Sequence, residues 1–174
     1  MTTKTRSLFT ALLAGGLVVA GLALPASAQE AKNLGTFNAW TAWTGSDTNG
    51  LICYISATPQ SSEPAGANRD PIHFLVIHRK GLGTKNEVQT LIGYPFNPQA
   101  NASASIDGKA YPLVTEGAAG WLASAGDEGG FVGSLKKGTA LVVKGTSQRG
   151  TVTTDNYSLS GVTAAMNAID QACS

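Results

Sequence analysis

Along most of the chain, apolar and polar residues alternate in short runs that are separated by glycine-rich turns. Segments 51–57 and 87–92 are rich in β-branched or alternating positions, which is typical of strands. Segment 72–78 is a nearly continuous apolar run and is expected to be a central strand buried on both faces. Weaker strands are expected at 36–43, 104–106, 109–111, 119–124, 139–144 and 151–154.

Turns and loops separate these strands. Asp107-Gly108 predicts a tight hairpin, because a type I′ turn needs a positive φ at both central residues. A second hairpin is expected around 145–150. Segment 58–71 contains three prolines and many small polar residues, which predicts a long exposed loop.

Helical patterning is confined to two places. Acids precede and lysines end segment 131–138, which suits the dipole of a short helix with Gly138 as its stop. Near the end of the chain Ser160 is a candidate N-cap. One helical stripe then contains Val162, Ala165, Met166, Ile169, Ala172 and Cys173. About eight strands with one terminal helix predict an all-β sandwich or barrel.

The first residues form a different kind of segment. Lys4 and Arg6 precede an apolar run over 8–24, and the run ends in Ala26-Ser27-Ala28. This order predicts a secretory signal peptide over 1–28 that is cleaved after Ala28. The alternative is a retained anchor, but a run of about 17 residues is short for a bilayer span of about 20. A single domain over 29–174 is expected in the periplasm or the medium, with no membrane span after cleavage.

Charge and cysteine content refine this picture. Removing 1–28 leaves ten basic and eleven acidic residues, so the exported chain is nearly neutral. Nucleic acid is therefore not expected as a partner, since duplex binding needs a concentrated basic surface. Cys53 and Cys173 are the two cysteines, and export permits a disulfide between them. Two buried free thiols are the alternative.

Candidate catalytic chemistry is weak. His73 and His78 are five residues apart on one predicted strand, so their side chains are expected on opposite faces. Ser134 begins an S-x-x-K pattern, but the other elements of penicillin-recognising enzymes are missing. No metal-ligand spacing occurs. We therefore expect no catalytic residue, no metal and no cofactor, with a hydrolase built on Ser134 and a histidine as the alternative.

The most distinctive polar segment is the 145–150 turn. Ser147, Gln148 and Arg149, together with Asp155, form a candidate binding loop. The alternative is a structural turn in which Arg149 pairs with Asp155. The 58–71 loop is a second candidate contact surface.

The C-terminal half resembles the invasion-associated locus B family. The residues that carry the resemblance are 137–138, 142–147, 149–151, Asp155, 157–161 and 164–165. Trp40, Trp43, Cys53, 93–96 and Trp121 also fit the family. The resemblance implies an immunoglobulin-like β-sandwich exported by a Gram-negative bacterium, with founding members linked to host-cell invasion and no established catalytic activity.

These observations favour a non-catalytic binding module of the cell envelope, whose partner is an envelope or host protein or glycan. A purely structural or stress-related envelope protein is a further alternative.

Overall fold

The computed structural model describes residues 31–174, so the predicted signal peptide lies outside the described residues. Eleven strands and two α-helices make up this part of the chain. The strands are β1 (Lys32–Phe37), β2 (Trp40–Asp47), β3 (Gly50–Ala57), β4 (Ser61–Glu63), β5 (His73–Arg79), β6 (Thr84–Leu91), β7 (Ala102–Ile106), β8 (Lys109–Glu116), β9 (Ala119–Leu122), β10 (Ala140–Thr146) and β11 (Val152–Ser158). The helices are α1 (Glu128–Lys137) and α2 (Val162–Ala172), with 3₁₀ turns η1 (Lys80–Leu82) and η2 (Ala125–Asp127).

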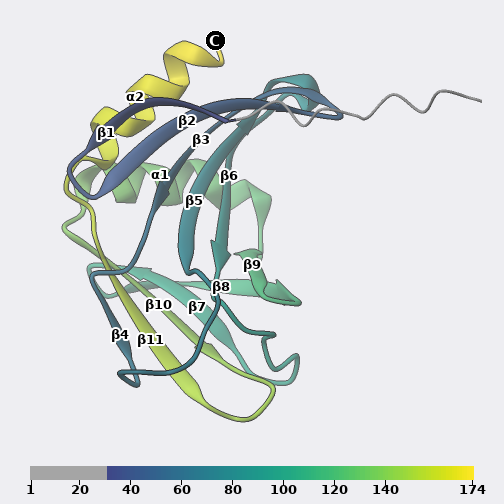
Figure 1. The fold of residues 1–174 in the computed structure, drawn as a ribbon, viewed down its shortest axis with the longest axis vertical. Coiled ribbons are helices and arrows are strands. Elements are labelled where there is room, and N and C mark those ends of the chain that lie inside the picture. Colours follow the sequence, from purple (N-terminus) through teal and green to yellow (C-terminus); the bar gives the residue numbers. More distant parts are fainter. Residues whose placement is uncertain (1–30) are drawn as a thin grey trace, which may run out of the picture.

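All eleven strands belong to one antiparallel sheet that folds over on itself. Its order is β1-β2-β3-β5-β6-β9-β8-β7-β10-β11-β4. The sheet bends back on itself between β6 and β9. Only Gln89–Leu91, at the end of β6, pair with β9. Figure 1 shows the result as two layers, one from β1 to β6 and the other from β9 to β4. The predicted all-β, sandwich-like fold with a C-terminal helix is confirmed. The two layers are joined by the hydrogen bonds between β6 and β9, so they form one continuous sheet.

The helices cover the inner face of the first layer. Helix α2 lies against β1, β2 and β3, and α1 lies against β6 and α2. The predicted stripe of α2 is buried at Val162, Ala165, Met166 and Ile169. Burial of this stripe supplies the stability that a helix of this length lacks in water.

An aromatic cluster joins the two layers. Phe74 of β5 lies at its centre, with ring centroids 6.4 Å from Trp40, 6.0 Å from Phe131 and 5.9 Å from Tyr157. The Trp40 indole also donates a hydrogen bond to the carbonyl of Ser158, at 2.9 Å. These rings come from β2, β5, α1 and β11, so the core depends on contacts between segments distant in sequence.

The predicted disulfide is confirmed. Cys53 and Cys173 have an S–S distance of 2.11 Å and a Cα–Cα distance of 6.0 Å. The bond ties the end of α2 to β3, and the alternative of two free thiols is wrong. A second contact lies alongside the disulfide. Nε2 of His78 in β5 is 2.9 Å from Oδ1 of Asp170 in α2.

Several sequence-based boundaries need correction. Segment 36–43 is not one strand but a hairpin, with Asn38 at a φ of 52° between β1 and β2. Helix α1 begins at Glu128, earlier than expected. The N-cap of α2 is Gly161 and not Ser160. Gly161 has a φ of 92°, and an added Cβ would lie 1.9 Å from the Phe37 carbonyl oxygen, so only glycine fits there.

Other local predictions are confirmed. Asp107 and Gly108 have φ values of 47° and 89°, as the tight hairpin between β7 and β8 requires. The hairpin expected around 145–150 is formed by β10 and β11.

Candidate functional site

Residues 58–72 form a long excursion between two neighbouring strands. Strands β3 and β5 pair in the first layer, yet the chain between them crosses to the second layer (Figure 1). There β4 pairs with β11, from Ser61–Asn156 to Glu63–Thr154. Connections of this length are uncommon in compact domains, and this one contains a short strand of its own.

Arg69 fixes the excursion to the sheet. Its guanidinium donates to both carboxylate oxygens of Asp155, at 2.8 and 2.7 Å. It also donates from Nε and Nη2 to the carbonyl of Ile92, at 2.9 and 2.6 Å. The guanidinium carbon lies 5.1 Å from the centre of the Tyr94 ring. The two charged side chains are 5% and 0% exposed, so this is a buried, bidentate ion pair.

Asp155 lies on the inner side of β11. Thr153, Asp155 and Tyr157 are alternate residues of the strand and are all buried. A carboxylate in this row needs a fixed cationic partner, because a buried unpaired charge is costly. Burial raises the pKa of the neighbouring Tyr157 phenol above its ordinary value, and the negative charge of Asp155 acts in the same direction.

The 147–151 turn lies beside the excursion and is held by main-chain hydrogen bonds. The Ser147 amide donates to the Thr151 carbonyl at 2.9 Å, and the Ser147 hydroxyl accepts from the Thr151 amide at 3.1 Å. The Gln148 amide donates to the Pro95 carbonyl at 3.1 Å. The side chains of Gln148 and Arg149 remain exposed. The turn is therefore a fixed scaffold that presents two exposed polar side chains.

A cavity of about 240 Å³ lies between the excursion and the turn, and we name it the turn pocket. It is lined by Pro64, Ala67, Asn68, Arg69, Tyr94, Ser147, Arg149, Thr151 and Thr153. These residues come from the excursion, from the segment after β6, and from the β10–β11 hairpin. Burial raises the pKa of the Tyr94 hydroxyl, which lies 2.6 Å from the Thr153 hydroxyl.

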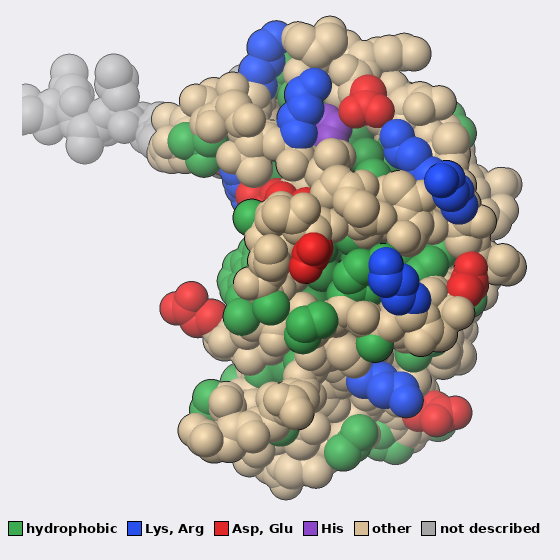
Figure 2. All heavy atoms as spheres, turned by 180° about the vertical axis from the view of Figure 1, so that it is seen from behind, with side chains coloured by type: hydrophobic (Ala, Val, Ile, Leu, Met, Phe, Trp, Pro, Cys, Tyr) green, Lys and Arg blue, Asp and Glu red, His purple; other side chains and the backbone are tan. Residues whose placement is uncertain are grey.

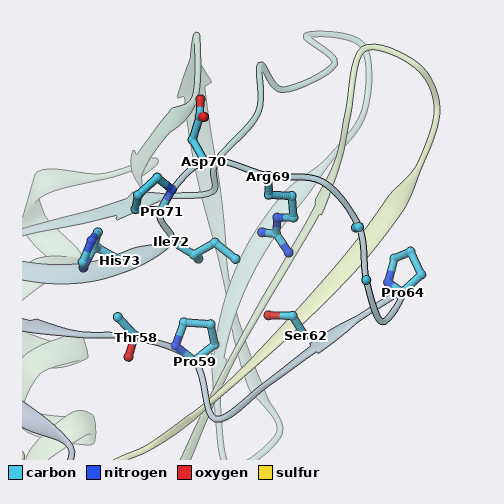
Figure 3. Close-up of a pocket in the computed structure, with 11 residues that line it drawn as sticks. Thr58, Pro59, Ser62, Pro64, Arg69, Asp70, Pro71, Ile72 and His73 are labelled. Atoms are coloured by element: carbon cyan, nitrogen blue, oxygen red, sulfur yellow. The ribbon is translucent and has the colours of Figure 1, made fainter.

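A second cavity of about 510 Å³, the loop pocket, lies within the excursion itself. Figure 3 shows the side chains of Arg69 and Ile72 directed toward the space above Pro59 and Ser62, while Asp70 points away. His73 forms one end of this cavity. Pro64, Ala67 and Arg69 line both cavities, so the excursion separates them.

The four predicted loop residues take different positions. Ser147 and Arg149 line the turn pocket, and Gln148 is exposed on the same turn without lining it. Asp155 lies beneath the pocket, fully buried and bound to Arg69. The alternative in which Arg149 pairs with Asp155 is therefore wrong, because Arg69 occupies both carboxylate oxygens.

Arg69, Tyr94 and Asn68 line the turn pocket but were not predicted as site residues from the sequence. One signal for Arg69 was present, because Asp155 occupies a strand position whose alternate neighbours are apolar or small. A charged residue at such a position predicts a buried partner of opposite charge. The excursion carries the arginine that meets this need.

The candidate catalytic groups are not brought together. Ser134 donates to the Gly130 carbonyl at 3.0 Å and is hydrogen-bonded to the Tyr111 hydroxyl at 3.0 Å. His78 accepts from the Asn86 amide at Nδ1, so its Nε2 carries the proton shared with Asp170. A serine nucleophile is activated by a neighbouring general base. Among the described residues, neither histidine is a hydrogen-bond partner of Ser134.

Residues 31–174 contain neither a metal-binding cluster nor a membrane-spanning helix. Within that range, no group of three or more His, Cys, Asp or Glu side chains is arranged to hold a metal ion. None of the helices described there has the length and apolar character that crossing a membrane requires.

Comparison with known proteins identifies the family. The family model "Invasion associated locus B (IalB) protein" matches residues 40–170. The crystal structure of invasion associated protein b from Bartonella henselae is similar in fold, with a TM-score of 0.57 and 13% identity. That match covers 81% of this chain and 97% of the other. No curated protein matches the sequence. Since the family model spans most of the chain, the protein belongs to the invasion associated locus B family.

Proposed function

We propose that this protein is an exported, non-catalytic binding module of the envelope of a Gram-negative bacterium. In this proposal residues 29–174 are the functional domain, released after cleavage of a signal peptide over 1–28. The disulfide supports export, because such bonds persist mainly in oxidising compartments. Membership of the invasion associated locus B family supports a link to invasion.

The observation that carries the proposal is the convergence of two polar segments. The 58–71 loop and the 145–150 turn are about 80 residues apart in sequence, yet both contribute to the turn pocket. Arg69 joins them to one rigid sheet through Asp155. Loops held on a rigid scaffold are where binding residues concentrate. We infer that partner contact occurs at this surface and that Arg149 takes part in it.

Quantitative capture of envelope material by the immobilised, oxidised protein tests this proposal. The arms are the wild-type protein, Arg149→Ala and Lys137→Ala. Both variants lose one positive charge at an exposed position, but Lys137 lies at the end of α1 and does not line the turn pocket. We expect a saturable set of captured molecules that Arg149→Ala reduces at least tenfold and Lys137→Ala retains. Equal capture by all three proteins would contradict the proposal.

A further inference from the structure

We propose that the turn pocket binds the carboxylate and neighbouring hydroxyls of an acidic saccharide, such as a uronic acid unit of a glycan. The inference rests on the proposed function and names the chemical class of its ligand. It depends on three features of the pocket, namely its charge, the hydrogen-bonding groups that remain free, and its size.

The pocket is locally basic. Arg149 lines it, and no acidic residue is among its lining residues. No ion pair to Arg149 is formed within residues 31–174. Elsewhere the protein is nearly neutral, and Figure 2 shows acidic and basic side chains interspersed over one face. A lone arginine charge in a pocket free of carboxylates favours an anionic ligand.

Arg69 adds an unused donor. A guanidinium has five N–H groups. Asp155 and Ile92 accept from Nε, from both hydrogens of Nη2 and from one hydrogen of Nη1. The second Nη1 hydrogen has no acceptor among the described residues. The side chain is only 5% exposed and lines both the turn pocket and the loop pocket, so this donor is a buried polar group at the wall that the two cavities share. Leaving such a group without a partner is costly, and a ligand oxygen would satisfy it.

Two acids near the pocket do not cancel this charge. Glu63 precedes Pro64 but is exposed and does not line the pocket. Asp70 follows Arg69 but lines the other cavity, and its side chain points away in Figure 3.

The remaining lining groups favour a saccharide over an acidic peptide. The Asn68 amide and the Thr151 hydroxyl make no side-chain hydrogen bond within the described chain. The Ser147 hydroxyl accepts from the Thr151 amide, and its own hydrogen has no acceptor among residues 31–174. Amide and hydroxyl groups both donate and accept, which suits a ring that carries several hydroxyls. A Glu or Asp side chain offers only acceptors, so an acidic peptide could meet the acceptors of the pocket only with its backbone N–H groups.

The size of the pocket agrees with one ring. Its volume of about 240 Å³ is below the range of about 300–1,000 Å³ that is usual for drug-sized ligands. Pro64 and Ala67 give one wall an apolar surface, on which the C–H groups of a sugar can pack.

Titration of the ¹⁵N-labelled, oxidised protein with trigalacturonate tests the inference. Two matched probes are the same trisaccharide with its carboxylates reduced to alcohols, and an acetylated, amidated tripeptide of glutamate. We expect trigalacturonate to shift the amide signals of residues 67–69, 94 and 147–153. Arg149→Ala should weaken its affinity at least tenfold, Thr151→Val severalfold, and Lys137→Ala not at all. The two other probes should bind at least tenfold more weakly than trigalacturonate.

Other outcomes contradict the inference. If the reduced trisaccharide binds as tightly as trigalacturonate, the protein does not recognise the carboxylate. Stronger binding of the glutamate peptide would identify an acidic protein segment as the ligand. If trigalacturonate does not bind but capture of envelope material still depends on Arg149, the ligand class is wrong and the proposed function stands. If neither trigalacturonate binding nor the capture of envelope material depends on Arg149, both the inference and the proposed function are wrong.

Discussion

The two ends of the molecule are stabilised in different ways. At one end, α2 is held by a buried apolar stripe and by the Cys53–Cys173 bond. At the other, the excursion is held by the ion pair between Arg69 and Asp155. Figure 1 shows α2 at the top of the fold and the β10–β11 turn at the bottom. We refer to them as the helix end and the loop end.

The difference shows where free polar groups remain. At the helix end both ring nitrogens of His78 are hydrogen-bonded, Nε2 to Asp170 and Nδ1 to the Asn86 amide. At the loop end Arg149 has no ion-pair partner among the described residues, and Arg69 keeps one free N–H. The disulfide and the doubly hydrogen-bonded histidine stabilise the helix end, and the groups that form these contacts keep no free donor. A polar anchor that is only partly satisfied can stabilise a loop and also bind a ligand.

Breaking the polar anchor should have the largest effect. Asp155→Ala leaves the Arg69 charge buried without a partner, and should reduce the free energy of unfolding by about 3–5 kcal/mol. Denaturant unfolding measures this. The double variant Arg69→Met/Asp155→Leu is the control and should lose much less, because no charge is left behind. A loss below about 1 kcal/mol for Asp155→Ala would show that the pair is not an anchor.

Removing the Cys53–Cys173 disulfide should have the second largest effect on stability. The bond closes a loop with a sequence separation of 120 residues. Cys173→Ser should therefore cost roughly 2–5 kcal/mol, mostly by freeing the unfolded chain. Hydrogen exchange should increase more in α2 than in β11, because the lost link is at the helix end. Equal melting temperatures for the oxidised and reduced proteins would contradict this account.

A smaller effect is expected at Tyr157, whose buried hydroxyl has no hydrogen-bond partner within the described residues. Tyr157→Phe should change stability at pH 8 by no more than about 1 kcal/mol. The folded state holds the phenolic proton to higher pH than the unfolded state, which releases it near pH 10. The contribution of Tyr157 to stability is therefore complete below about pH 10 and is lost as the pH rises beyond it.

The Phe variant should lack this part of the alkaline loss. Unfolding midpoints at pH 8 and pH 11 measure the difference. An identical decrease in both proteins would show that Tyr157 does not contribute to it.

The smallest stability effect is expected at Arg149. The side chain is exposed, so Arg149→Ala should change the free energy of unfolding by less than about 0.5 kcal/mol. The melting temperatures of the wild-type protein, Arg149→Ala and the control Lys137→Ala, measured by thermal unfolding, check this. A large fall in melting temperature with capture of envelope material unchanged would mean that Arg149 is structural.

The sequence predicted features that depend on local chemistry. Asp107-Gly108 specified its own hairpin, and the stripe from Val162 to Cys173 specified a docked helix with the disulfide at its end. The hairpin at Asn38 was missed, because a turn with one positive φ residue has a weaker sequence signal than Asp-Gly. The cap at Gly161 was missed because its cause is the close approach of Phe37, which lies on another part of the chain.

The candidate site was predicted in part for the same reason. Arg149 and Ser147 stood out because they lie in a turn between two glycines. Arg69 did not, since its role depends on a carboxylate 86 positions later in the chain. A single sequence shows which residues are polar, but the pairing of distant charges appears only when the strands are placed.

The most direct test of the central claim compares the two ends in cells. A photo-crosslinking amino acid replaces Gln148 at the loop end or Asn167, an exposed residue of α2, at the helix end. We predict a discrete adduct from position 148 that disappears when Arg149→Ala is added, and none from position 167. An adduct from position 167 alone, or one from position 148 that survives Arg149→Ala unchanged, would contradict the assignment of binding to the loop end.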